Sequence, residues 1–411
     1  MKRSLFFIAV ACTSVVRAQG LDAVLATIKA DNAWTLAQQR SICEIPAPPF
    51  KEAARAAEYK RRLESLGLTA RIDSIGNVIA ERPGTGAGPT VVLAGHLDTV
   101  FPEGTDVKVK DAGDRMLGPG IGDDCRGLAV VLAVARAYQR WNPSHRGRII
   151  FVGNVGEEGP GNLRGVRHLF DSELKGRIDY FISVDGQGLD FVSRAVGSNR
   201  YRVTYKGPGG HSYSAFGIPN PIHALGRAIE IISDIQVPAT PKTTFSVGVV
   251  SGGTSVNSIA FEASMEIDMR SESAASVAEV DARVRAALTA ALNAENARWP
   301  GERAAAARLT MVIDTIGIRP TGAQGDSSRI VQVAFQTARA LGFSPNATAS
   351  STDANLPISR GVPAITIDGG GRGQGSHSLN EWYEDGPSGW LGPQWAALIV
   401  ARLAGVLGAQ P

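Results

Sequence analysis

The stretch that decides the fold is TVVLAGHLD, residues 90–98. Its first part, 90–94, is an apolar run of strand length, and side chains alternate between the two faces of a strand. A strand that is apolar on both faces is typical of a sheet covered by helices on both sides. His96 and Asp98 follow this strand directly, which is where ligands bind in open α/β sheets.

Two similar apolar runs follow, RIIFV at 148–152 and YFISV at 180–184. The spacing of apolar residues in 128–138 predicts a helix between the first two of these strands. Shorter strands are expected at 68–72 and 77–81. This alternation of strands and helices predicts an α/β fold with a mostly parallel sheet sandwiched by helices.

The pattern changes near Ser198. The next elements are expected in the order strand–helix–strand–strand–helix–strand, which is the split βαβ arrangement of a ferredoxin-like α+β domain. They lie at 200–205, 221–232, 245–251, 258–270, 276–294 and 308–314. From about Ile316 the α/β pattern returns. The sequence therefore predicts a domain at 199–314 that is inserted into a larger domain made of 19–198 and 315–411.

Composition excludes some classes of function. Hydrophobic residues make up 44% of the 411 residues, so a sizeable core can form, and the net charge is only +3. Because no run of Lys and Arg forms a basic stripe, we expect no nucleic-acid partner. No stretch is long and apolar enough to predict a membrane-spanning helix.

The N-terminus resembles a secretory signal peptide at 1–18. Lys2 and Arg3 precede an apolar run, and Ala18 provides the small residue before the expected cleavage site. Attachment of a lipid at Cys12 is the alternative. A cleaved signal predicts a periplasmic or secreted protein.

Two cysteines remain in the mature chain, Cys43 and Cys125. They could pair in an oxidising compartment, but two cysteines alone do not establish a disulfide. Their spacing excludes a cysteine-based zinc finger, so a metal site must use histidine and carboxylate ligands.

Two adjacent carboxylates, Asp123 and Asp124, follow the Gly-rich segment LGPGIG and precede the helix 128–138. Capping of this helix is one role that an aspartate can have there. A carboxylate held in a tight loop can instead bridge two cations.

Glu157 and Glu158 form a second acidic pair, beyond the strand 148–152 and flanked by glycines. Adjacent carboxylates repel each other, so a bound cation would account for the pair. One could bind metal while the other acts as general base on a water molecule. The alternative is a pair of solvated loop carboxylates.

The remaining candidates also follow predicted strands. Asp185 ends the strand 180–184, and His377 lies in a Gly-rich loop. Histidine and carboxylates bind zinc, and two zinc ions about 3.5–4 Å apart need a bridging carboxylate. We therefore expect two Zn²⁺ per chain, with Co²⁺ or Mn²⁺ as alternatives. The five expected ligands are His96, Asp124, Glu158, Asp185 and His377.

Eight segments together resemble the cocatalytic zinc exopeptidase superfamily. This superfamily includes aminoacylases, glutamate carboxypeptidases, succinyl-diaminopimelate desuccinylase and peptidase T. The segments cover nearly the whole mature chain in the order GHLDTV, GPGIGDDCRG, GNVGEEG, SVDG, GPGGHS, GGTSVNSIA, IDMRS and GSHSLNEW. The resemblance implies a zinc exopeptidase fold, with the inserted domain as a lid or dimerisation domain, and a homodimer.

The resemblance also implies a role for each metal ligand. One zinc ion would be bound by His96 and Asp185, the other by Glu158 and His377, with Asp124 as the bridge. Asp123 remains an alternative bridge, because the family motif often has one acidic residue where this chain has two.

Other residues would act around the metals. Asp98 would orient the first histidine, and Glu157 would pass a proton from the bridging water to the leaving amine. His211 would stabilise the oxyanion, usually in the site of the partner subunit. Asn257 and Arg270 match positions that contact substrate, and Arg270 could hold a free carboxylate through two parallel hydrogen bonds. Exposed strand positions are the alternative for these two residues.

The sequence thus predicts a metal-dependent hydrolase that cleaves an amide or peptide bond in small peptides or N-acyl amino acids. A dizinc-activated water would be the nucleophile. A desuccinylase-type deacylase and a non-catalytic binding protein of the same fold are the alternatives. Glu157 argues against a binding protein, which needs no base beside a metal ligand. A serine hydrolase is not supported, because no Gly-x-Ser-x-Gly turn follows a strand with a suitable His downstream.

Overall fold

The computed structural model describes residues 21–406. The expected signal peptide and Cys12 lie outside these residues. The chain forms two compact units, one made of 21–195 and 323–406 and the other of 196–322. Within the described part of the chain, no helix has the length and apolar character needed to cross a membrane.

The first unit is built on a nine-stranded sheet. Its strand order is β1-β2-β6-β3-β7-β17-β8-β15, and β16 pairs with β8. The central strands β6, β3, β7 and β17 are parallel neighbours, whereas β2 is antiparallel to its two neighbours, β1 and β6. The strands are β1 (Ala70–Ile72), β2 (Val78–Arg82), β3 (Thr90–His96), β6 (Arg148–Asn154), β7 (Tyr180–Val184), β8 (Phe191–Ala195), β15 (Gly322–Ala323), β16 (Ala347–Ser350) and β17 (Ala364–Ile367).

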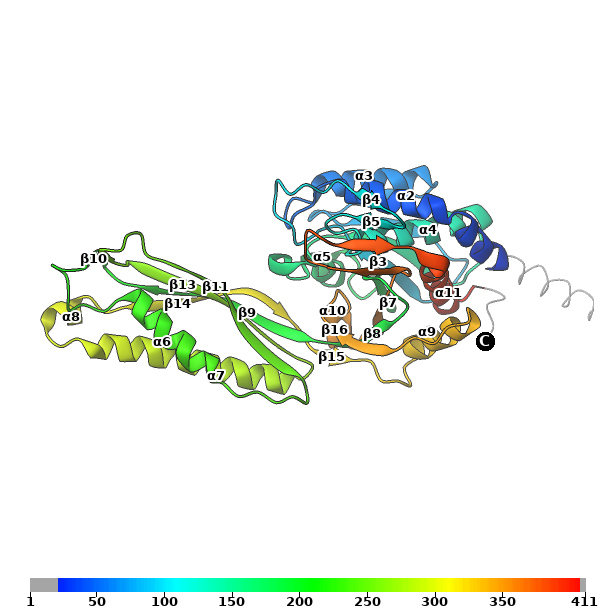
Figure 1. Ribbon diagram of the computed structural model, residues 1–411. Coiled ribbons are helices and arrows are strands. Elements are labelled where there is room, and N and C mark those ends of the chain that lie inside the picture. Colours follow the sequence, from blue (N-terminus) through cyan, green and yellow to red (C-terminus); the bar gives the residue numbers. More distant parts are fainter. Residues whose placement is uncertain (1–20, 407–411) are drawn as a thin grey trace, which may run out of the picture. The chain divides into compact units, whose positions relative to one another are not determined.

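Helices cover both faces of this sheet (Figure 1), as the apolar run at 90–94 predicts. Val91 and Leu93 belong to the larger core, which includes residues of α3 (Ala53–Ser65), α4 (Cys125–Trp141), α9 (Arg329–Ala340) and α11 (Leu391–Ala404). Val92 and Ala94 pack on the other face. The elements there are α5 (Arg164–His168), the π-helix η2 (Leu169–Glu173) and α10 (Asn355–Ser359).

The N-terminal helical segment of the first unit is interrupted. Residues 21–30 are helical, Asp31 lies in a turn, and α2 (Asn32–Cys43) follows. Two short 3-10 helices, η1 (Gly159–Gly161) and η3 (Gly386–Ser388), also belong to this unit. Cys43 and Cys125 are both buried and form no disulfide.

A small four-stranded antiparallel sheet in the first unit joins distant parts of the chain. Its order is β18-β19-β5-β4, with β4 (Lys110–Ala112), β5 (Arg115–Leu117), β18 (Arg372–Gln374) and β19 (Trp382–Glu384). The loop after β5 carries Asp123, and the loop between β18 and β19 carries His377. Pairing of β19 with β5 therefore brings these two loops together.

The inserted unit has the expected ferredoxin-like order of elements. These are β9 (Gly197–Lys206), α6 (Pro221–Ser233), β11 (Thr243–Gly252), β13 (Glu262–Ser271), α7 (Ala274–Arg298) and β14 (Thr310–Arg319). The antiparallel sheet has the order β11-β13-β9-β14. The strand expected at 258–270 is split into β12 (Ser258–Ile259), which pairs with β10 (Gly210–His211), and β13. The short helix α8 (Glu302–Ala306) lies between α7 and β14.

Both helices of this unit cover the same face of its sheet (Figure 1). Alternate residues of β9 and β13, such as Val203 and Ile267, are buried against α6 and α7. The residues between them, such as Arg202 and Glu266, point to the other face and form ion pairs there.

Candidate metal centre

Three neighbouring parallel strands end at the same edge of the large sheet. His96 is the last residue of β3, Asp185 directly follows β7, and Glu157 and Glu158 follow β6 after a short turn. Because β6, β3 and β7 are adjacent, their carboxyl ends bring these side chains to one place.

Asp98 positions both the side chain of His96 and the loop that carries Glu157 and Glu158. The Nδ1 atom of His96 lies 3.0 Å from the carbonyl oxygen of Asp98 and 3.7 Å from its Oδ1. The Asp98 carboxylate accepts the backbone N–H groups of Glu157 (3.0 Å) and Glu158 (2.8 Å). Burial opposes ionisation of Asp98, but the interaction with His96 and these N–H groups lowers its pKa below the ordinary value. Asp98 thus contacts both His96 and the loop that carries Glu157 and Glu158.

The carboxylate of Asp123 lies between two histidines. Its Oδ1 is 3.1 Å from Nε2 of His96, and its Oδ2 is 3.1 Å from Nε2 of His377. His377 Nε2 is also 3.1 Å from Oε1 of Glu158. The hydrogen bonds to Asp123 and Glu158 raise the pKa of His377 to about 10. The Asp123 carboxylate thus lies between His96, expected to bind one ion, and His377, expected to bind the other.

Asp124, the bridge expected from the sequence, has a different set of contacts. Its Oδ1 accepts the N–H of Gly127 (2.9 Å) and caps α4, and its Oδ2 accepts the N–H of His96 (2.8 Å). Asp124 still lies within reach of His96 and Asp185. Because each of its oxygens already binds an N–H group, the contacts favour Asp123 as the bridging residue and correct the expectation.

Several carboxylates lie close together in the buried part of this site. Burial raises the pKa of Asp185 well above its ordinary value, and the charge of Asp123 adds to the effect. The pKa of Asp124 is raised well above its ordinary value in the same way. Burial also raises the pKa of Glu158 to about 7, although His377 opposes this shift. Like charges without solvent are costly, and divalent cations would relieve the repulsion.

The donor atoms are close enough for such cations. One group consists of His96, Asp123 and Glu158, and the other of His96, Asp124 and Asp185. Within each group, one ligand atom per residue lies within 4.8 Å of the others. Imidazole nitrogen and carboxylate oxygen are donors that zinc and similar divalent ions accept. The residues present therefore fit a pair of divalent metal ions.

Residues 92–388 match the sequence profile of Peptidase family M20/M25/M40. This chain belongs to that family. Membership makes the protein a hydrolase of the peptidase or amidohydrolase type, and members of this family are typically dependent on two metal ions.

Relatives of this M20 member include the uncharacterized protein YqjE of Bacillus subtilis. It is 26% identical over an alignment of 346 residues that covers 79% of this chain and 87% of YqjE. A succinyl-diaminopimelate desuccinylase of Methylobacillus flagellatus is 30% identical over an alignment of 252 residues that covers 55% of this chain and 65% of the desuccinylase.

Solved structures share the fold. A tripeptidase from Staphylococcus aureus has a TM-score of 0.71 at 22% identity and covers 92% of this chain and 98% of its own. Human carnosine dipeptidase 1 has a TM-score of 0.71 at 14% identity, with 93% and 99% covered.

Glu381 is a part of this M20 site to which sequence reasoning gave no role. Its buried carboxylate accepts the backbone N–H groups of Gly120 (2.7 Å), Gly122 (2.8 Å) and Asp123 (3.0 Å). Burial raises the pKa of Glu381 to about 7 despite these hydrogen bonds. Its presence in the segment GSHSLNEW, four residues after His377, was the available signal.

Two buried arginines also support the site. Arg55 of α3 donates to the carbonyl oxygens of Leu97 (2.8 Å) and Ile45 (2.6 Å), which fixes the chain between His96 and Asp98. Arg126 of α4 donates to the carbonyl oxygens of two glycines at 369 and 389. Sequence reasoning missed both, because an arginine in an amphipathic helix is normally exposed.

Glu157, the expected base, is 4% exposed. Near it lies Asp353, whose Oδ2 accepts Nδ2 of Asn154 at 2.7 Å. Burial and the charge of Glu157 raise the pKa of Asp353 to about 7, although His96 and Asn154 oppose this shift. Glu157 thus lies in a largely buried and acidic environment.

The other expected site residues, His211, Asn257 and Arg270, lie at two different ends of the inserted unit. His211 pairs with Ser258, and the N–H of Ser212 donates to the carbonyl oxygen of Asn257 (2.9 Å), so His211 and Asn257 lie close together. Arg270 lies near the far end of β13, where its Nε donates to Asp268 (2.6 Å). From Glu262 to Arg270 the strand extends roughly 26 Å, at about 3.3 Å per residue. Within one inserted unit, His211 and Arg270 are thus too far apart to contact the same small substrate.

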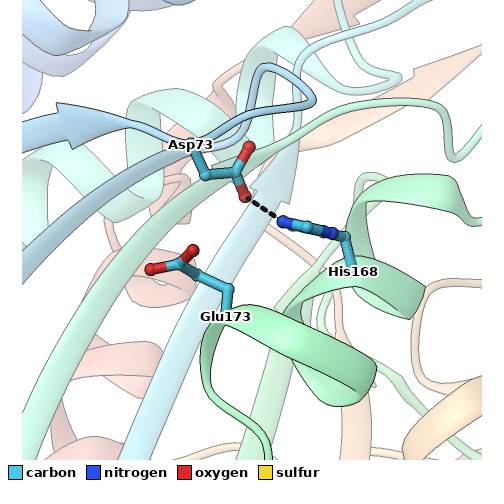
Figure 2. Close-up of side chains that lie close together, drawn as sticks. All are labelled: Asp73, His168 and Glu173. Atoms are coloured by element: carbon cyan, nitrogen blue, oxygen red, sulfur yellow. Dashed lines mark ion pairs between the residues drawn. The ribbon is translucent and has the colours of Figure 1, made fainter.

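Another group of potential metal ligands lies around the turn between β1 and β2 (Figure 2). Asp73, His168 and Glu173 have ligand atoms within 4.8 Å of one another. However, Asp73 Oδ1 already accepts three backbone N–H groups of the turn 75–77, and Glu173 pairs with Arg71 (2.6 Å). These contacts explain the group without a metal, and we assign none to it.

Proposed function

We propose that this chain is a dimetal hydrolase that cleaves the amide or peptide bond of a small peptide or an N-acyl amino acid. The position of the Asp123 carboxylate, 3.1 Å from both His96 and His377, carries the proposal. It supplies the bridge that a two-metal site requires, at the edge of the sheet where the other ligands gather.

The metal ligands that we propose form two pairs around this bridge. His96 with Asp185 would hold one ion, Glu158 with His377 would hold the other, and Asp123 would contact both. Two zinc ions held there would polarise the scissile carbonyl group and lower the pKa of a water molecule. The family and the donor atoms support two divalent ions, and zinc is our proposal for their identity.

Glu157 is the general base in this proposal. Its backbone N–H is held by Asp98, so its position relative to the histidine ligand is fixed. The Glu157 carboxylate accepts a proton from the attacking water and donates it to the leaving amine. Asp98 holds Nδ1 of His96, which leaves Nε2 to face Asp123 and the metals.

We propose that the active protein is a homodimer with shared sites. His211 and Asn257 lie at the opposite end of the inserted sheet from Arg270, so one substrate cannot contact both ends within a single chain. A partner subunit would supply His211 as donor to the oxyanion, and Arg270 would bind the substrate's carboxylate.

We propose two related substrate classes, peptides and N-acyl amino acids. A desuccinylase relative supports a deacylase, and the tripeptidase and dipeptidase share only the fold. Hydrolysis of a panel of di- and tripeptides, N-acetyl amino acids and N-succinyl amino acids, with added zinc, cobalt or manganese, separates these classes.

We also propose export of the protein on the basis of residues 1–18. Protein recovered from the periplasm or culture medium should begin at Gln19. A mature protein that retains Met1 in the cytoplasm contradicts this proposal.

The central test combines metal analysis with the Glu157→Gln variant. The protein should contain about two metal ions per chain, and Glu157→Gln should retain them while kcat falls about 10²- to 10⁴-fold. Glu103→Gln, a change of an exposed glutamate paired with Lys51, is the matched control and should keep full activity. Metal-free protein that hydrolyses peptides at the normal rate contradicts the dimetal mechanism.

A further inference from the structure

Two cysteines that are far apart in the sequence lie together beside the metal centre. Cys43 is the last residue of α2, and Cys125 is the first residue of α4, directly after Asp123 and Asp124. Both cysteines are 0% exposed. They belong to a small buried cluster that also contains Val109, Ile121 and Tyr383. The end of α2 and the start of α4 therefore meet in this cluster.

Two side chains of α2 hold the loop that leads to the aspartates. Gln39 donates its Nε2–H to the carbonyl oxygen of Ile121 at 2.8 Å. The Cys43 thiol donates to the carbonyl oxygen of Pro119 at 3.4 Å. Because residues four apart lie on the same face of a helix, one face of α2 contacts the segment 119–125 through both side chains. This contact brings the Cys43 sulfur to the first turn of α4.

The two thiols also interact directly. Burial raises the pKa of the Cys43 thiol well above its ordinary value, and a hydrogen bond with the Cys125 thiol adds to the effect. A disulfide requires two cysteine side chains that point toward each other from backbone positions a short distance apart. Thiols that already share a hydrogen bond point toward each other. The pair therefore has the arrangement from which a disulfide can form.

We propose that Cys43 and Cys125 become linked by a disulfide, and that this bond fastens the loop of Asp123 and Asp124 to α2. The oxidant is a small-molecule disulfide of the glutathione type. One protein thiolate attacks it to give a mixed disulfide and releases one glutathione. The second protein thiolate then attacks the protein sulfur of the mixed disulfide and releases the other glutathione. Two protein thiols are thus oxidised, the glutathione disulfide is reduced, and the two thiol protons pass to the released glutathione molecules.

The position of the bond determines its effect. A disulfide restricts the unfolded chain, and the restriction is larger for a long loop such as the one from Cys43 to Cys125. The bond would also hold the segment 119–125 in place before metal is bound, when the carboxylates of Asp123 and Asp124 are not neutralised by cations. Because both sulfurs are buried in the folded protein, we expect oxidation to occur while the chain folds.

Refolding of the full chain in a glutathione redox buffer tests whether the bond forms. Trypsin places Cys12, Cys43 and Cys125 in three different peptides, which are 4–17, 41–51 and 116–126. After free thiols are alkylated, mass spectrometry of the unreduced digest should find peptide 41–51 linked to peptide 116–126 in most of the protein. Recovery of these two peptides mainly in the alkylated form, or linked mainly to 4–17, overturns the proposal.

Thermal unfolding of the metal-free protein measures the effect of the bond on stability. We expect the oxidised wild type to unfold at least about 5 °C above the reduced wild type. Cys43→Ala and Cys125→Ala should each abolish this difference between oxidised and reduced samples, whereas Cys12→Ala should keep it. Comparing two samples of the same variant cancels the packing that each substitution removes. If a variant does not fold, the wild-type comparison decides, and equal unfolding temperatures in its two forms overturn a stabilising bond.

Metal release tests the link to the loop of Asp123 and Asp124. Zinc-loaded wild type is mixed with a chelator, in the oxidised form and after reduction with a phosphine, which lacks the thiols of common reductants. The oxidised form should lose zinc at least about threefold more slowly. Equal rates of loss overturn the effect on the loop, even where the disulfide has formed. Because this measurement needs no substrate, its outcome does not depend on the proposed hydrolysis.

Discussion

Glu381 accepts the backbone N–H of Asp123 at 3.0 Å, from a position 258 residues further along the chain. The same carboxylate holds two other N–H groups of the loop that carries Asp123. A buried residue near the C-terminus thus fixes the loop of the carboxylate that lies between His96 and His377.

Replacement of Glu381 should therefore weaken metal binding. In Glu381→Ala three backbone N–H groups lose their acceptor, and each buried group left unpaired costs about 1–3 kcal/mol. We expect metal affinity to fall at least about tenfold, as measured by competition with a chelator. Glu384→Ala, which removes a carboxylate paired with Arg115 and Arg372, is the control and should keep its metal. Normal metal affinity in Glu381→Ala would sink this explanation.

The two adjacent aspartates should differ in what their replacement changes. Asp123→Asn should reduce metal affinity and kcat strongly, with a smaller effect on the melting temperature of the metal-free protein. Asp124→Asn should lower the stability of the metal-free protein by about 1–2 kcal/mol, because α4 loses a charged cap and the N–H of His96 loses an acceptor. Metal titration and thermal unfolding distinguish the two. The reverse ranking would restore Asp124 as the bridge.

Asp368 should make stability depend on pH. Burial and the charge of Asp190 raise its pKa from the ordinary 3.8 to about 7, although the Asp190 N–H opposes this. Since the folded protein binds this proton more tightly than the unfolded chain, its contribution to stability falls as pH rises from about 4 to 7. Asp368→Asn removes this titration. The free energy of unfolding of the variant relative to wild type should therefore be on the order of 1–2 kcal/mol higher at pH 8 than at pH 5.

Urea unfolding at the two pH values checks this prediction. Asp171→Asn is a suitable comparison, because Asp171 is exposed and paired with Arg360, which lowers its pKa. Its difference from wild type should be small and should not favour the variant at high pH. If Asp368→Asn changes the free energy of unfolding equally at pH 5 and pH 8, the prediction that Asp368 ionises in this pH range is wrong.

Shared active sites predict complementation between two inactive variants. A dimer of one His211→Ala chain and one Glu157→Gln chain has one site with both residues intact if His211 acts across the interface. Co-expressed variants should then show about a quarter of wild-type activity, because half of randomly mixed dimers are mixed and each has one intact site. Dimers purified with two different tags provide the check. Mixed dimers without activity would place His211 outside the partner's site.

Much of the fold could be predicted from runs that are buried on both faces. The segments 90–94 and 148–152 are apolar throughout because helices cover both sides of the sheet, and their carboxyl ends had to coincide once the strands were parallel. The positions of His96 and the acidic pair at 157–158 followed from this. The strands at 110–117 and 372–384 are too short for a periodic pattern, so their pairing was not predicted.

Other features depend on contacts that no local pattern contains. Asp123 and Asp124 are chemically identical, and the N–H groups of His96 and Gly127 decide which of them caps the helix. Arg55 and Glu381 are charged residues that are normally exposed, and their burial became visible only with the carbonyl and N–H groups that they bind.

The small sheet that joins β5 to β19 determines when the metal centre can form during protein synthesis. His96, Asp123, Glu158 and Asp185 are made in the first half of the chain, whereas His377 and Glu381 leave the ribosome only after the whole inserted unit. A growing chain therefore carries its acidic ligands without the second histidine or the clamp on the Asp123 loop. We therefore expect metal loading to follow translation, once the C-terminal segment has supplied His377 and Glu381.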